Sequence, residues 1–239
     1  MRINKQVFFL IAVFILTAWS ASLPKLFLIG DSISIQYGPY LEKYLRGFAS
    51  YERKQDDGSA NKNLDYPTGA NGGDSKMVLN YLRHKLDEPG FKPDYLLLNC
   101  GLHDIKRNTV TREIQVPEEE YRENIETIIQ LLKKRHIQMI WMRTTAVVDS
   151  IHNAKSSSFH RFATDVETYN QIADEVCAKN KIPVIDLHSF TKQLGEEQFT
   201  DHVHYKEPAR ALQAAFIAGA VRTILNTESK SKEKHNTRM

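Results

Sequence analysis

The segment spanning residues 25–34 constrains the fold of this chain more than any other part of the sequence. An uninterrupted apolar run over residues 26–29 ends abruptly at Gly30-Asp31-Ser32. Such a run is typical of a strand buried on both faces, as in a parallel sheet. Gly30 permits a sharp exit, and Gly38-Pro39 marks a point where the next helix can begin. We therefore expect Ser32 at the carboxyl end of a central strand, where open α/β sheets bind ligands.

Further apolar runs alternate with amphipathic stretches along the chain. The predicted strands lie at 48–52, 95–100, 137–148 and 182–186, and the predicted helices at 39–46, from 75 onward, and at 118–136, 159–180 and 207–225. This alternation predicts one parallel sheet with helices on both faces and right-handed crossovers. The polar segment 55–63 is expected to be a surface loop.

Composition indicates an ordinary single-domain protein. The chain has 239 residues, 41% of them hydrophobic and 26% charged, which is enough for one sizeable core. Its net charge of +3 includes Arg2 and Lys5, which lie in the N-terminal segment. The remainder is close to neutral, so we expect no nucleic-acid partner. We expect a monomer.

The first 22 residues have the order of parts found in a secretory signal. Arg2 and Lys5 precede a continuous apolar stretch over residues 7–16, and small residues follow at cleavage spacing. We predict a cleaved signal peptide over 1–22, a catalytic domain over 23–226 and a disordered polar tail over 227–239. The product would be secreted or periplasmic, with no stable membrane span after cleavage. The alternatives are an uncleaved N-terminal anchor and a buried N-terminal helix.

The two cysteines are expected to be buried free thiols. Cys100 ends an apolar run, and Cys177 lies within a predicted helix among apolar neighbours. A disulfide between them is the alternative. Neither cysteine has the neighbours of a catalytic thiol.

Polar groups that could carry chemistry occur in four loops. Asp201 stands three residues before His204, a spacing that lets a carboxylate turn back onto an imidazole and fix its tautomer. A serine hydroxyl needs such a base because it is a weak nucleophile at neutral pH. The four loops are Gly30-Asp31-Ser32, Gly72-Gly73-Asp74-Ser75, Gly101-Leu102-His103-Asp104 and Asp201-His202-Val203-His204.

These loops, in this order, resemble the sequence blocks of the SGNH/GDSL family of serine esterases and acylhydrolases. The resemblance extends from residue 26 to about residue 225, and its first and last blocks are the most specific. It implies a three-layer α/β/α sandwich around a flavodoxin-like parallel sheet of about five strands. It also implies a serine carboxylic-ester hydrolase that needs no cofactor and no metal.

Carried over by position, the resemblance makes Ser32 the nucleophile, His204 the general base and Asp201 its orienting carboxylate. The oxyanion hole would consist of the amides of Ser32 and Gly73 and the side chain of His103. His103 stands where the family has asparagine, and a neutral imidazole can donate one N–H only in the correct tautomer. An imidazolium would donate more strongly and would make activity depend on pH.

A second Gly-Asp-Ser sequence ends at Ser75. It follows a polar glycine loop rather than a buried strand, and Ser75 is placed to cap a helix, so we favour Ser32. Taken alone, a serine such as Ser32 is more often a helix cap than a nucleophile, and His204 is more often an ordinary histidine. For His152, His160 and Arg161 we expect the solvated surface, with the lining of a substrate groove as the alternative.

The predicted activity is hydrolysis of a small-molecule or glycan ester through an acyl-enzyme, with O-deacetylation of a carbohydrate favoured over lipid hydrolysis. A lysophospholipase or thioesterase is the alternative on the same fold. Two different classes also stay open. One is a metal-dependent hydrolase using His202 and His204 with Asp201, His103 and Asp104. The other is a catalytically silent binding domain.

Overall fold

The computed structural model describes residues 22–55 and 58–236, with side chains described as far as residue 229. Its centre is a five-stranded sheet in the order β2-β1-β3-β4-β5, in which every pair of neighbours is parallel. The strands are β1 (Lys25–Ile29), β2 (Ser50–Arg53), β3 (Tyr95–Leu98), β4 (Gln138–Met142) and β5 (Val184–Ile185). This order is that of a flavodoxin-like sheet, as the resemblance to the SGNH/GDSL family implied.

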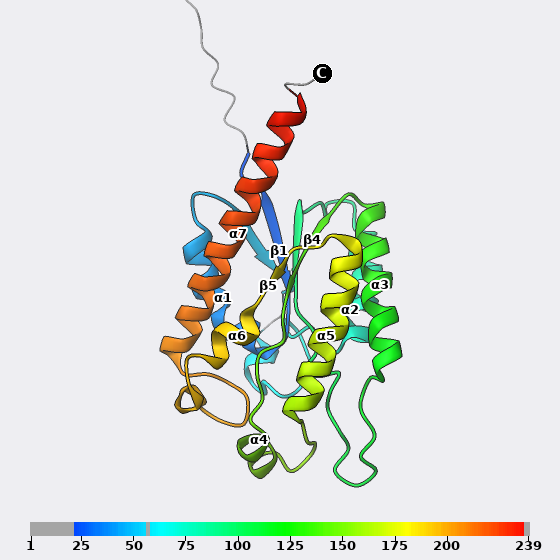
Figure 1. Ribbon diagram of the computed structural model, residues 1–239, viewed down its shortest axis with the longest axis vertical. Helices are drawn as coiled ribbons and strands as arrows, with labels where there is room; N and C mark the ends of the chain where they lie inside the picture. Colours follow the sequence, from blue (N-terminus) through cyan, green and yellow to red (C-terminus); the bar gives the residue numbers. More distant parts are fainter. Residues whose placement is uncertain (1–21, 56–57, 237–239) are drawn as a thin grey trace, which may run out of the picture.

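Helices cover both faces of the sheet (Figure 1). One face carries α1 (Ser32–Leu45), α6 (Leu187–Lys192) and α7 (Glu207–Asn236), and α7 packs against both α1 and α6. The other face carries α2 (Ser75–Lys85), α3 (Glu118–Lys134) and α5 (Ala163–Asn180), which pack in that order. The predicted three-layer α/β/α sandwich is confirmed.

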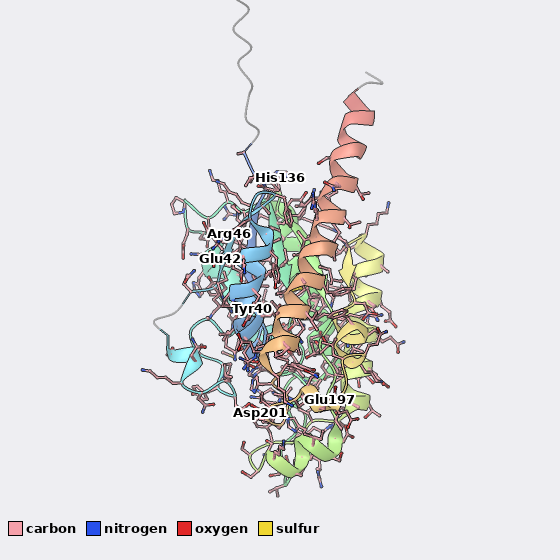
Figure 2. All side chains as sticks on the ribbon, turned by 90° about the vertical axis from the view of Figure 1, so that its left-hand side faces the viewer. Tyr40, Glu42, Arg46, His136, Glu197 and Asp201 are labelled. Carbon is pink, nitrogen blue, oxygen red and sulfur yellow. The ribbon has the colours of Figure 1, made fainter. Side chains whose placement is uncertain are left out.

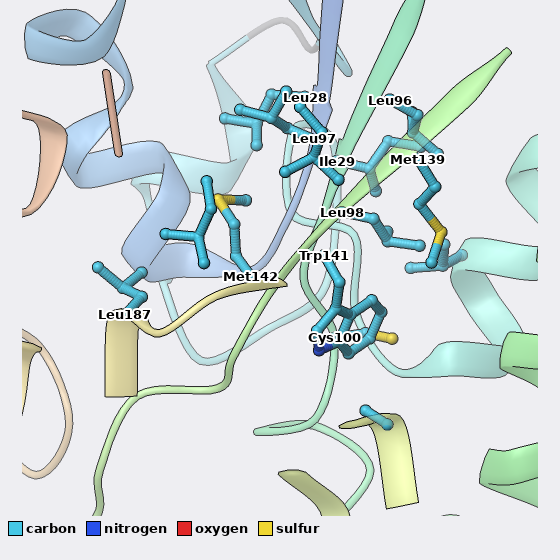
Figure 3. Packing of buried hydrophobic residues seen from close by; sticks show 14 of the residues in the cluster. Leu28, Ile29, Leu96, Leu97, Leu98, Cys100, Met139, Trp141, Met142 and Leu187 are labelled. Carbon is cyan, nitrogen blue, oxygen red and sulfur yellow. The ribbon is translucent and has the colours of Figure 1, made fainter. Parts of the chain in front are cut away.

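The central strands are buried on both sides because each sheet face is covered by helices. All four residues of β3 are buried, and Leu96, Leu97 and Leu98 have no exposed surface. Trp141 of β4 and Cys100 are both fully buried and belong to the same core cluster (Figure 3). The central strands therefore form the middle of the core. Their packing fixes the positions of the strand ends and so of the loops that follow them.

The first helix begins earlier than the sequence predicted. We expected it to start near Pro39, but α1 begins at Ser32 and Pro39 lies inside it. Asp31 is the N-cap, and its carboxylate accepts a hydrogen bond from the amide of Ile33 at 3.0 Å. This cap satisfies an amide of the first turn, so the helix can start directly at the strand exit.

Other boundaries also differ from the predicted ones. β4 ends at Met142 rather than near residue 148, and a short unpredicted helix, α4 (Asp149–Lys155), follows it. α5 begins at Ala163 rather than residue 159, and α7 continues to Asn236 rather than ending at residue 225. The segment 227–236 lacks glycine and proline, so it can extend the helix. The expected irregular tail is thus helical through most of its length.

Cys100 and Cys177 are both buried and free, as predicted. The expected signal segment falls on residues 1–22, of which all but the last lie outside the described residues. Within the described part of the chain, no helix is both long and apolar enough to cross a membrane.

Candidate active site

Ser32 lies where β1 gives way to α1, as the first residue of the helix. Gly30 allows this close approach of strand and helix, because a β-carbon there would meet Cβ of Ser34 at 2.8 Å. Its carbonyl accepts the amide of Gly72 at 2.8 Å. Ser32 is only 4% exposed. Since the amides of a helix's first turn have no partner within the helix, its N–H points out of the N-terminus, where the helix dipole favours negative charge.

A continuous hydrogen-bonded chain joins the predicted nucleophile, base and carboxylate. The Ser32 hydroxyl lies 2.8 Å from Nε2 of His204, and Nδ1 of His204 lies 2.8 Å from Oδ2 of Asp201. With the proton on Nδ1, the imidazole donates to Asp201 and accepts from Ser32. The structure therefore brings Ser32, His204 and Asp201 into the arrangement that activates a serine hydroxyl.

Asp201 is held in place by its own loop. Its Oδ1 accepts the amides of Val203 at 2.9 Å and of His204 at 2.8 Å, while Oδ2 faces the imidazole. Burial raises the pKa of the Asp201 carboxyl, but the hydrogen bonds from His204 and from the two amides outweigh it and hold the pKa below its usual value. Asp201 lies at the end of the molecule opposite His136 (Figure 2).

The loop that carries Gly73 is folded tightly beside this chain of hydrogen bonds. Gly73 has φ +73°, a left-handed conformation that favours glycine, and a β-carbon there would meet Sδ of Met77 at 2.6 Å. Its amide donates to Oδ1 of Asn71 at 3.0 Å. The Gly73 N–H is therefore occupied by Asn71 and would have to be shared with a substrate oxyanion.

His103 is buried, and its surroundings keep it uncharged. The side chain is 3% exposed, and within the described part of the chain its Nδ1 has no hydrogen-bond partner. Burial lowers the pKa of His103 well below its usual value, and the charges of Lys106, Arg161 and His204 lower it further. The imidazolium that the sequence left open is thus disfavoured, and any hydrogen bond from His103 comes from the neutral ring.

Ser75, the serine of the second Gly-Asp-Ser, is held by hydrogen bonds to neighbouring side chains. Its amide donates to Oδ1 of Asp104 at 2.8 Å, and its hydroxyl accepts from Nδ2 of Asn124 at 3.0 Å. Asp74 caps the helix α2 by accepting the amide of Met77. Through its hydrogen bond with the Ser75 amide, Asp104 connects the third loop to the second. Burial raises the pKa of Asp104 to about 7.

A second histidine–carboxylate pair, which the sequence analysis missed, lies beside the first. Nε2 of His202 is 2.9 Å and 3.0 Å from the two oxygens of Asp65, and the His202 and His204 rings are 5.7 Å apart. Asp65 and His202 are separated by 137 positions, so no local spacing could have indicated the pair.

The predicted metal ligands are only partly brought together. Among the described residues, the group whose ligand atoms lie within 4.8 Å of one another is Asp65, His202 and His204. His103 and Asp104 are not members of it. Asp201 is engaged with Nδ1 of His204.

Arg161 and His152 are buried, which corrects the prediction that they lie on the solvated surface. Arg161 is 2% exposed and His152 has no exposed surface. Nε of Arg161 donates to the carbonyl of Leu102 at 2.5 Å, and Nη1 lies 3.0 Å from Nε2 of His152. Arg161 therefore supports the loop that presents His103.

A mostly apolar pocket of about 240 Å³ lies behind the loop that carries His204. Its walls include Val147 and Val148, from the chain after β4, and Phe199 and Tyr205, which flank the predicted Asp201/His204 loop. Ser32 does not line it. The pocket therefore adjoins the loop, but Ser32 is not part of its wall.

Comparison with solved structures places the fold among acylhydrolases. The structures include a lipase/acylhydrolase from Enterococcus faecalis (19% identity, TM-score 0.63, covering 84% of this chain and 96% of that one). An acetyl xylan esterase is 18% identical, with a TM-score of 0.57 and coverage of 84% and 98%. A GDSL-like lipase from Bacteroides thetaiotaomicron is 16% identical, with a TM-score of 0.57 and coverage of 84% and 88%. No curated protein matches the chain.

The family model of the GDSL-like lipases and acylhydrolases matches residues 28–209. The matched region includes all four polar loops and extends from β1 into the first turn of α7. Since it covers most of the chain, the protein belongs to the GDSL-like lipase/acylhydrolase family of ester hydrolases.

Proposed function

We propose that this protein is an exported serine esterase that removes acetyl groups from a carbohydrate. The observation that carries the proposal is the hydrogen-bonded chain from Ser32 through His204 to Asp201. It supplies a nucleophile, a base of fixed tautomer and a carboxylate that stabilises the imidazolium formed during the reaction.

In the first half of the reaction, Oγ of Ser32 attacks the ester carbonyl carbon while Nε2 of His204 takes the hydroxyl proton. The tetrahedral oxyanion would be held by the amides of Ser32 and Gly73 and by the neutral ring of His103. His204 then gives its proton to the departing alkoxide, and the C–O bond of the ester breaks. In the second half, water gives a proton to His204 and attacks the carbonyl carbon of the acyl-enzyme. His204 then returns this proton to Oγ of Ser32 as the bond between Oγ and the acyl carbon breaks, which releases the acid and restores Ser32.

Two observations favour a small acyl group on a polar alcohol. Ser32 is 4% exposed among close-packed loops, which suits an acetyl group. The pocket that could accept a longer apolar chain is not lined by Ser32. An acetyl xylan esterase shares the fold, so the scaffold is compatible with deacetylation of a polysaccharide. Export is proposed from the pattern of residues 1–22.

The test compares the wild-type protein with Ser32→Ala on acetylated glycans and on a series of acyl esters of increasing chain length. We expect wild-type turnover to be highest on acetyl esters, and Ser32→Ala to lower kcat by several orders of magnitude with an unchanged melting temperature. Turnover by Ser32→Ala near the wild-type rate would refute the serine mechanism. A preference for long-chain esters would instead support a lysophospholipase or thioesterase.

A further inference from the structure

Two cationic side chains contact a single aromatic ring beside the catalytic residues. Nζ of Lys106 lies 4.3 Å from the centre of the Phe159 ring, and the guanidinium carbon of Arg161 lies 4.7 Å from it. Lys106 also donates to the backbone carbonyl of Asp65 at 3.1 Å. Across residues 22–55 and 58–229, neither cation forms an ion pair with a carboxylate.

This group adjoins the proposed catalytic residues through two routes. Arg161 donates to the carbonyl of Leu102, the residue before His103. The His202 ring lies 6.2 Å from Phe159 and 5.7 Å from His204. The charges of Lys106 and Arg161 also act on His103, so both lie within electrostatic range of the oxyanion site.

Holding two like charges here is costly without an anion. Burial and, to a smaller extent, the Arg161 charge lower the pKa of Lys106 to about 8. Burial also lowers the pKa of Arg161 to about 10. The carboxylate of Asp65 attracts both cations, and that of Asp31 attracts Arg161, which offsets part of this cost. Asp65 is nevertheless engaged with His202 and forms no direct ion pair with either cation. A negative charge placed against Lys106 would offset this penalty.

We propose that Lys106 and Arg161, which both contact the Phe159 ring, form an anion subsite that binds a carboxylate group of the substrate. Lys106 and Phe159 are half-buried and reach solvent, so Lys106 makes the direct contact. Arg161 is buried and acts by its charge and by positioning the Leu102 carbonyl. The substrate is then the ester of an acidic sugar, and the inference rests on the proposed esterase activity.

The test uses a matched pair of esters. One is a singly O-acetylated methyl galacturonoside, and the other is its carboxyl methyl ester, which has the same acetyl group but no charge. For the wild-type protein in 20 mM salt we expect kcat/KM to be at least tenfold higher for the charged ester, through a lower KM. In 500 mM salt the ratio should fall below threefold, because added ions screen the attraction.

The variants separate charge recognition from a structural role. Lys106→Gln should bring the ratio of the two kcat/KM values close to one, while Lys106→Arg should keep most of it. Lys134→Gln is the matched control and should retain the full ratio. Lys134 is exposed at the end of α3, just before β4 begins, and so lies at the amino ends of the strands, away from the carboxyl ends that carry Ser32.

The other outcomes are also decisive. Equal kcat/KM values for the two esters in the wild-type protein would overturn the subsite. So would a Lys106→Gln variant that loses activity on both esters equally and keeps the wild-type ratio, because that marks a structural lysine. No hydrolysis of either ester by a protein that hydrolyses 4-nitrophenyl acetate would overturn the subsite, whereas no hydrolysis of any of the three esters would refute the proposed esterase activity itself. Inhibition by galactose 6-sulfate stronger than by galacturonate would assign the subsite to sulfate and overturn the carboxylate.

Discussion

Replacing His103 tests the one position where this chain departs from the sequence blocks of its family. We compare His103→Asn with His103→Leu, because the two new side chains have similar size and both are smaller than histidine. Asparagine can donate an N–H to an oxyanion, whereas leucine cannot. The difference between the two variants therefore isolates the hydrogen bond from the loss of volume.

The expected magnitude follows from the burial and charge of His103. The ring is 3% exposed and uncharged, so its N–H would act as a neutral donor in a dry site. Removing one donor from an oxyanion hole typically costs about 2.7–4 kcal/mol, or 10²–10³ in kcat. A neutral donor lies at the lower end, since charged ones are roughly twice as strong. We expect His103→Leu to lower kcat about 100-fold, and His103→Asn to keep activity within tenfold of wild type.

The assay is steady-state hydrolysis of 4-nitrophenyl acetate from pH 5 to 9, with melting temperatures as a check on folding. Because burial keeps the His103 pKa well below this range, wild-type and His103→Asn proteins should give pH profiles of the same shape. The reasoning is refuted if His103→Leu and His103→Asn have the same kcat. Loss of activity in His103→Asn alone would show a role specific to imidazole.

Three further substitutions test the rest of the site. Asp201→Asn should lower kcat about 10⁴-fold by favouring the wrong tautomer of His204, while KM stays unchanged; a loss below tenfold would contradict the role of Asp201. Burial raises the pKa of Asp104 from 3.8 to about 7, so between these pH values the folded protein binds a proton that the unfolded chain has released. The free energy of unfolding should therefore fall as the pH rises from about 4 to 7. Urea titrations should show Asp104→Asn removing up to about 4 kcal/mol of this pH dependence, and equal slopes in both proteins would contradict the assignment. Gly73→Ala should lower the free energy of unfolding by about 1–2 kcal/mol, because alanine is strained at φ +73° and meets Met77; an unchanged melting temperature would contradict this.

The sheet was predictable because its strands are buried on both faces and read as unbroken apolar runs. The runs that contain β1 and β3 gave both strands to within a few residues. The start of α1 was not predictable in the same way, since Gly38-Pro39 looks like a helix start. The side chain of Asp31 provides an earlier cap, and a proline within a helix is tolerated where packing against neighbours compensates. The preference of Pro39 for the first turn of a helix was therefore overridden by the Asp31 cap and by the packing of α1.

The candidate site was also predictable only in part. Asp201 and His204 are close in sequence, so their contact could be inferred from spacing, and family order connected them to Ser32. The pairs Asp65–His202 and Lys106–Phe159 join residues far apart in the chain, on loops whose course the sequence does not specify. The burial of Arg161 was missed for the same reason, because its partners are Leu102 and His152 on other loops.

The packing of α7 against α1 has a consequence for the newly made chain. The helix that begins at Ser32 is synthesised well before His204, which follows 172 positions later, and before α7. A ribosome-bound chain therefore carries its proposed nucleophile without its proposed base until these 172 positions have been synthesised. Under the proposed mechanism, the hydroxyl of Ser32 stays unreactive during this interval and is activated only when His204 reaches it.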